Sequence, residues 1–286
     1  MSKGIVDSVA VLACAVTFSI GALAQSVPQA PANAKSSAPA YDPHDLNGTW
    51  IASGGGAGGQ SQDLAPVAVR TEWMRAPLPL TPDGLAVLNS RKGGKGPRGV
   101  APSKANDPIG DANPPGLART FLLGQYRIQF ITLPTETVNL FEWYHMWRQI
   151  WTDGRKLPDE PDLLWYGTSV GKWDGDTFVV NTVGLDPRCW LDEWGAPYSE
   201  DMKLTERWHR VDQNTIEFTI TVNDPKFYTK VWTSDKRIFR LAKGANAELK
   251  EVIYAPLDEQ EFDERIRDPN TPVSTGSQGN PNPSHR

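Results

Sequence analysis

Short runs of alternating apolar and polar residues fill the chain from Tyr126 onward, and turn residues separate these runs. Between Thr215 and Val222 the apolar Ile216, Phe218, Ile220 and Val222 alternate with polar residues, so their side chains face one core. The run "WYGTSVGKW" meets "TFVVNTVG" across Asp174-Gly175-Asp176, which predicts a hairpin. Many short strands joined by hairpins predict an all-β, mostly antiparallel fold, either a barrel or a sandwich.

The segment before Tyr126 lacks this alternation. It holds "GGGAGG" from Gly54, the basic "RKGGKGPRG" from Arg91 and "NDPIGDANPPG" from Asn106. The basic run lacks the spacing of a phosphate-binding P-loop, with no strand before it and no helix after it, so it predicts a solvated loop. One convincing helix is expected, over residues 257–266. The strands are therefore predicted to follow a long irregular N-terminal part and to precede a short C-terminal helix.

The two ends of the chain differ in composition from the segment between them. Residues 1–24 hold the apolar run "VAVLACAVTFSIGALA" before Gln25, which predicts a secretory signal peptide cleaved after Ala24. A membrane anchor and a lipoprotein signal at Cys14 are the weaker alternatives. Residues 25–45 read as a flexible linker, residues 46–267 as one domain and residues 268–286 as a disordered tail. The protein is predicted to be periplasmic or secreted, with no membrane span after cleavage.

Charge and composition exclude several functions. The 286 residues contain 29 Lys+Arg and 34 Asp+Glu, a net charge of -5, which gives no electrostatic footprint for nucleic acid. After cleavage Cys189 has no partner for an intramolecular disulfide, and a lone cysteine is most often a small buried hydrophobe. With only His145 and His209 left in the domain, no metal site is predicted. No nucleotide or other cofactor fingerprint is present, so no cofactor is expected.

The aromatic stretch from Asn139 to Arg155, "NLFEWYHMWRQIWTDGR", is interpreted as one central strand. Strand periodicity would place Phe141, Trp143, His145, Trp147, Gln149 and Trp151 on one face and Leu140, Glu142, Tyr144, Met146, Arg148 and Ile150 on the other. If the second face looks into a barrel, Glu142 and Arg148 are interior charges, which are costly unless they are paired or serve a ligand.

A second strand, "KLTERWHRV", repeats this mixture. Leu204, Glu206, Trp208 and Arg210 share one face, and Thr205, Arg207, His209 and Val211 share the other. One interpretation is an Arg–Glu lattice that braces the barrel while tryptophans fill it. The other is a cavity whose aromatic walls hold a flat ligand while a few polar groups orient it.

A loop between these strands carries acids beside aromatic residues. In "GLDPRCWLDEWGAPYSED" these are Trp190, Asp192, Glu193, Trp194 and Tyr198. Burial beside indoles raises carboxyl pKa values and suits a carboxyl to general acid or base chemistry. The alternative is a lid held by aromatic packing.

Several motifs resemble a known family. "DLNGTW" resembles the Gly-x-Trp opening of lipocalin-like (calycin) barrels, with Gly48 and Trp50 in the motif positions. "WRQIWTDGR", "SVGKWDGDTFVVNTVG", "TERWHR" and "NDPKFYTKVW" resemble a widespread, uncharacterised family of exported bacterial barrels of this calycin type. The resemblance spans roughly residues 106–232 and implies a lipocalin-like barrel with Trp50 packed at its closed end. It implies a fold more than an activity.

The sequence thus predicts an aromatic-lined pocket for a small apolar or aromatic molecule. The first hypothesis is an enzyme with cofactor-free acid–base chemistry, of the lyase, hydratase or isomerase type. Its candidate catalytic residues are Asp192, His145, Glu142 and Arg148, and its candidate substrate-binding residues are Tyr144, Trp165, Tyr166, Trp190, Tyr198, Glu206 and Arg207. Arg148 or Tyr166 would stabilise negative charge.

Two other hypotheses use the same residues differently. In one, the protein is a carrier that binds a small molecule in the cell envelope and releases it unchanged. In the other, exposed tryptophans form a protein interface, which predicts self-association, as in a homodimer.

Overall fold

The computed structural model describes residues 41–53, 69, 71–101, 104–111, 113–122 and 126–251. The predicted signal peptide, most of the predicted linker, the predicted helix at 257–266 and the predicted tail lie outside these residues, so they stay predictions.

Strands dominate the described part of the chain. They are β1 (Gly48–Ser53), β2 (Arg127–Thr132), β3 (Glu136–Phe141), β4 (Trp147–Trp151), β5 (Thr168–Asp174), β6 (Thr177–Val183), β7 (Lys203–Asp212), β8 (Thr215–Asn223), β9 (Trp232–Thr233) and β10 (Arg237–Leu241). The helices are α1 (Pro82–Ser90) and α2 (Leu117–Thr120), with 3₁₀ turns at η3 (Pro108–Asp111), η4 (Trp143–His145) and η5 (Gly244–Ala247).

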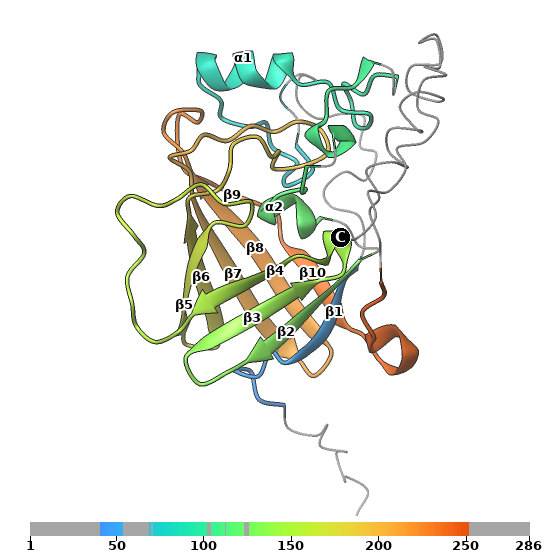
Figure 1. The fold of residues 1–286 in the computed structure, drawn as a ribbon, viewed down its shortest axis with the longest axis vertical. Coiled ribbons are helices and arrows are strands. Elements are labelled where there is room, and N and C mark those ends of the chain that lie inside the picture. The colour runs from blue at the N-terminus through green and yellow to red at the C-terminus, as the bar shows by residue number, and fades with distance from the viewer. Residues whose placement is uncertain are drawn as a thin grey trace, which may run out of the picture. The chain divides into compact units, whose positions relative to one another are not determined.

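The strands form one sheet that closes on itself. Its order is β10-β1-β2-β3-β4-β5-β6-β7-β8-β9, and a further pairing of β10 with β8 joins nine of the strands into a barrel (Figure 1). Neighbours pair antiparallel except β4 and β5, which run parallel, with Ile150 opposite Ser169. The predicted all-β, mostly antiparallel barrel is confirmed, as is the hairpin of β5 and β6.

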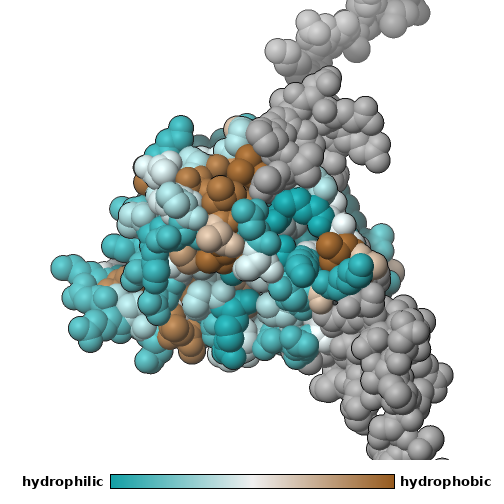
Figure 2. All heavy atoms as spheres, turned by 90° about the horizontal axis from the view of Figure 1, so that it is seen from above, coloured by the Kyte–Doolittle hydropathy of each residue, from teal (hydrophilic) through white to brown (hydrophobic). Residues whose placement is uncertain are grey.

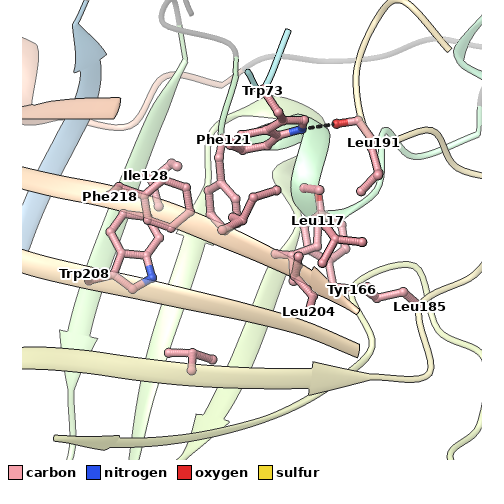
Figure 3. Close-up of a cluster of buried hydrophobic side chains, with 14 of the residues drawn as sticks. Trp73, Leu117, Phe121, Ile128, Tyr166, Leu185, Leu191, Leu204, Trp208 and Phe218 are labelled. Carbon is pink, nitrogen blue, oxygen red and sulfur yellow. Dashed lines mark hydrogen bonds between the residues drawn. The ribbon is translucent and has the colours of Figure 1, made fainter. Parts of the chain in front are cut away.

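Alternation along the long strands decides what fills the barrel. In β8 the side chains of Ile216, Phe218, Ile220 and Val222 are buried, as the sequence pattern predicts. In β7 the buried face is the one that carries Leu204, Glu206, Trp208 and Arg210. Phe218 and Trp208 lie at the centre of the interior, 4.0 Å apart between ring centroids (Figure 3). Phe121, at the end of α2, packs edge-on against Trp208 at 5.3 Å (Figure 3). Aromatic rings in mutual contact therefore occupy the centre of the barrel.

The stretch from Asn139 to Arg155 is not one strand, so that interpretation is wrong. β3 ends at Phe141 and β4 begins at Trp147, and the two pair antiparallel as a hairpin with Asn139 opposite Arg148. The reversal occurs at η4, where Tyr144 (φ 61°) and His145 (φ 48°) take left-handed backbone conformations that non-glycine residues seldom adopt. Because the chain reverses there, the face assignment that assumes a continuous strand does not hold across the turn.

α1 and the described residues on either side of it cover one end of the barrel, called the α1 end below (Figure 1). Thr81 caps α1, since its hydroxyl accepts the N–H of Gly84 at 3.1 Å. The basic run that follows is only partly solvated. Arg91 and Arg98 donate to backbone carbonyls of Ala196 (3.0 Å) and Trp194 (2.5 Å), so this run packs against the loop that carries Asp192.

Trp50, in the Gly-x-Trp motif, is fully buried. Its indole N–H donates to the carbonyl of Leu46 at 2.9 Å, and the guanidinium of Arg210 lies 5.5 Å from the centre of its ring.

Candidate functional site

Two of the predicted site residues form an ion pair inside the barrel. Arg148 and Glu206 are 3% and 0% exposed, and two parallel hydrogen bonds of 2.7 Å join them. Asn139 accepts the Nε–H of Arg148 at 2.9 Å, and the indole of Trp208 donates to Glu206 at 2.9 Å. In such a bidentate pair neither buried charge is left without its counter-charge. This geometry matches the Arg–Glu lattice rather than a ligand cavity.

Glu142 forms a second buried pair, with Arg127. Its carboxylate lies 2.9 Å from the Arg127 guanidinium and accepts the backbone N–H groups of Arg127 and Lys250, both at 2.8 Å. Burial raises the pKa of Glu142, but these hydrogen bonds outweigh it and the net pKa is lowered. The ionised carboxylate therefore fastens the end of β3 to β2 and to the chain near Lys250.

Other predicted site residues lie at the barrel surface. His145 is exposed, and Tyr144 packs edge-on against Trp143 with ring centroids 5.3 Å apart. Arg207 is exposed on the outer side of β7 and pairs with Asp174 at 3.1 Å. The structure does not bring these residues together with the interior pair.

Two buried tyrosines and a half-buried tryptophan complete the predicted set near the barrel wall. Tyr166 is hydrogen-bonded to the hydroxyl of Thr120 at 3.0 Å, and Tyr198 donates to the carbonyl of Asp186 at 2.6 Å. Burial raises the pKa of both phenols well above the usual value, so both stay protonated. Trp165 lies under the guanidinium of Arg188, 4.3 Å from its ring centre.

Cys189 sits beside Tyr198 and is buried, as the sequence predicts. Burial raises the pKa of its thiol to about 12, so the nucleophilic thiolate is scarce at neutral pH. The neighbouring Trp190 is buried too, with the guanidinium of Arg91 5.4 Å from its ring centre.

Asp192 is completely buried, and both oxygens of its carboxylate accept hydrogen bonds. One of its oxygens accepts the Thr71 hydroxyl (2.6 Å) and the N–H of Glu72 (2.9 Å), and the other accepts the N–H groups of Trp194 (3.0 Å) and Ala196 (2.8 Å). The four donors belong to two chain segments that lie far apart in sequence, one at Thr71 and the other at Trp194. Asp192 therefore joins the Asp192 loop to the chain at Thr71 and presents no accessible oxygen of its own.

Glu72, which no sequence pattern indicated, is a partly accessible acid of this region, as is Glu193. Its side chain is partly exposed, and one oxygen accepts the N–H of Glu193 at 2.8 Å. Within the described ranges no hydrogen bond to its second oxygen is present. Burial, and then the negative charge of Asp192, raise its pKa from 4.5 to about 7. Glu72 is therefore the carboxyl of this region that exchanges protons near neutral pH.

Glu193 links Glu72 to a set of cations. Its carboxylate lies 3.1 Å from Lys95 and 3.8 Å from Arg119, and Arg119 in turn holds Asp107 through two hydrogen bonds of 2.8 Å. The Nε atom of Arg119 is buried and has no hydrogen-bond partner in the described part of the chain. We call Glu72, Asp192 and Glu193 the carboxylate cluster.

Arg237 supports the carboxylate cluster from β10. Its guanidinium packs over the ring of Trp73 (4.9 Å) and donates to the backbone carbonyl of Glu72. Burial lowers its pKa to about 10, with Glu72 the strongest charge acting against that change. Trp73 is itself fixed, since its indole donates to the carbonyl of Leu191 at 2.7 Å (Figure 3).

Sequence signals for Glu72 are weak. It stands in "TEWMR", where an acid precedes a tryptophan, as in the Asp192 loop, but the surrounding segment has no periodicity that predicts burial. Its environment comes from contacts with residues about 120 positions away, which no local pattern reveals.

Seen from the α1 end, the surface is mostly hydrophilic, with apolar residues gathered in a few patches (Figure 2).

Across the described ranges, no three His, Cys, Asp or Glu side chains are arranged to hold a metal ion. No helix in the described part of the chain is long and apolar enough to cross a membrane.

Comparison of the chain with models of protein families, with curated proteins and with solved structures found no match. The fold class is a closed, mixed β-barrel, and the resemblance to calycin-type exported proteins stays a prediction.

Proposed function

We propose that this protein is an exported enzyme that carries out cofactor-free proton transfer on a small apolar or aromatic molecule, with Glu72 as the general acid and base. The observation that carries the proposal is the state of Glu72: a partly exposed carboxyl with a pKa of about 7, set beside a buried carboxylate. At neutral pH comparable fractions of Glu72 are ionised and protonated, so one group can both take a proton and return it.

The surroundings of Glu72 suit a reaction of the isomerase, hydratase or lyase type. In the ionised form Glu72 would remove a proton from the substrate. In the protonated form it would return that proton to another atom of the substrate, or to a leaving hydroxyl group that departs as water. Asp192 acts as a positioning residue, because its negative charge raises the pKa of Glu72 while it holds the backbone N–H of Glu72. The half-buried Trp194 supplies nearby aromatic surface.

Export rests on the sequence pattern of residues 1–24, and a periplasmic or secreted location follows from it. No partner macromolecule is needed for this chemistry.

The test uses the full mature chain at trace concentration, mixed with a small-molecule extract of the host's growth medium and followed by untargeted mass spectrometry. We expect loss of one compound far beyond one equivalent of protein, with a matching product. Glu72→Gln should slow that turnover by at least about 100-fold, the usual contribution of a general acid or base. Glu217→Gln, which alters a carboxylate paired with Lys236 on the outer side of β8, is the matched control and should not change it.

Other results would redirect the proposal. Retention of about one equivalent of an unchanged compound would make the protein a carrier. Equal turnover by wild type and Glu72→Gln would remove Glu72 from the reaction and leave the enzyme class standing.

A further inference from the structure

An open cavity of about 260 Å³ lies at the α1 end. Its walls come from α1 and the residue after it, from the loop around Tyr198 and from the loop after β8. Drug-sized ligands occupy about 300–1,000 Å³, so this cavity suits a smaller molecule.

Arg91 forms one wall of the cavity, and its guanidinium bonds to backbone carbonyls rather than to a carboxylate. Its guanidinium donates to the carbonyls of Ala196 (3.0 Å), Pro187 (3.3 Å) and Gly195 (3.5 Å), all of them neutral. Within the described part of the chain it forms no salt bridge, unlike Arg119, which holds Asp107 with both terminal nitrogens. Burial lowers the pKa of Arg91 to about 10, and the negative charge of Asp192 acts against that change.

A second cation, Lys226, lies in the same lining. Its ammonium is 3.7 Å from the carboxylate of Glu200, and both side chains are about half exposed (50% and 55%), so their mutual attraction is weak. Glu200 is the one acid among the lining residues. The lining residues therefore carry two cations and one acid, and the buried carboxylate of Asp224 lies behind the wall, where it accepts from Ser199.

The neutral polar groups of the lining are already engaged. Tyr198 donates its hydroxyl proton to Asp186 at 2.6 Å, and Ser199 donates to Asp224 at 2.8 Å. The charge available to a ligand therefore comes from Arg91 and Lys226. The remaining lining residues, Val87, Pro187 and Phe227, are apolar.

We propose that this cavity binds a small organic carboxylate with an apolar or aromatic body, its carboxylate neutralising Arg91 and Lys226 and its body packing against Val87 and Phe227. Arg91 supplies a fixed cation, with those N–H groups that its three carbonyl bonds leave over, and Lys226 supplies a mobile point charge. This site is separate from the proton-transfer chemistry proposed for Glu72, and it does not depend on that proposal.

The test titrates the full mature chain with benzoate and follows the amide NMR signals of Val87 and Phe227. We expect a saturable shift with one site, at least tenfold weaker binding of the neutral isostere benzamide, and a loss of at least fivefold in Lys226→Met. Lys230→Met removes the same charge from an exposed position outside the cavity lining and should bind benzoate as wild type does. Arg91→Lys, which keeps the charge but loses the guanidinium N–H groups, should bind at least threefold more weakly.

Three results would overturn the proposal. These are equal binding of benzoate and benzamide, equal effects of Lys226→Met and Lys230→Met, and binding of inorganic phosphate as tight as that of benzoate. The first two results would show that the cavity does not recognise the ligand's negative charge. The third would show that the ligand's apolar body does not contribute to binding. Because Lys226 is half exposed, its variant keeps the test valid even if Arg91→Lys fails to fold.

Discussion

The barrel interior and the carboxylate cluster use the same residue types in opposite ways. Inside the barrel, both oxygens of Glu206 accept hydrogen bonds from Arg148, and one of them also accepts the indole N–H of Trp208. Neither oxygen is therefore available to a ligand. At the α1 end, the partly exposed Glu72 keeps one oxygen without a described partner. The comparison teaches that a carboxylate is open to a ligand only where one of its oxygens is not already hydrogen-bonded.

The largest expected effect comes from breaking the interior pair. Glu206→Ala leaves Arg148 and the Trp208 indole buried without their acceptor, so the free energy of unfolding should fall by about 3–5 kcal/mol. Urea denaturation followed by circular dichroism measures this. The paired variant Arg148→Met with Glu206→Leu should recover most of the loss, since an apolar pair of similar volume replaces both charges. A loss below about 1 kcal/mol in Glu206→Ala would contradict the bracing role of this pair.

A medium effect on the free energy of unfolding is expected from replacing Glu72, and here the replacement should stabilise the protein rather than destabilise it. The pKa of Glu72 in the folded protein, about 7, lies above its ordinary 4.5, so the folded chain binds more protons between these values. This contribution to stability is complete below pH 4.5 and is lost as the pH rises through 7. Glu72→Gln cannot ionise and should exceed wild type in stability at pH 8, by at most about 3 kcal/mol.

Urea denaturation at several pH values between 4 and 8 checks this difference. Equal pH dependence in the two proteins would show that Glu72 has an ordinary pKa and would undo its contrast with Glu206.

The smallest effect is expected at Arg207, which the sequence groups with Glu206 as a pocket residue. Its pair with Asp174 is exposed, and such pairs contribute about 0–1 kcal/mol. Arg207→Ala should therefore change neither the unfolding midpoint in urea nor any turnover by appreciable amounts. A loss of turnover with unchanged stability would move the site to the outer side of β7.

Strand alternation made β7 and β8 predictable, because one face of each strand is buried along its whole length. The β5–β6 hairpin was predictable from its turn residues. The reversal at Tyr144 and His145 was not, because it uses left-handed backbone at residues that carry no glycine, proline or asparagine signal.

In the candidate site, too, some features could be predicted from the sequence and others could not. Burial of Asp192 beside tryptophans was expected from the loop composition, and the structure adds that its oxygens are fully occupied. Glu72 could not be found, because its raised pKa arises only when two segments distant in sequence meet.

The pairing of β1 with β10, which sets Trp50 opposite Leu241, governs how the chain reaches its final form. The first strand has no β10 neighbour until nearly the whole domain has been made, and contacts of such long sequence separation slow folding. The barrel therefore stays open until β10 is present. Truncation before Arg237 would leave the edges of β1 and β8 unpaired, and these edges could then pair with strands of other chains.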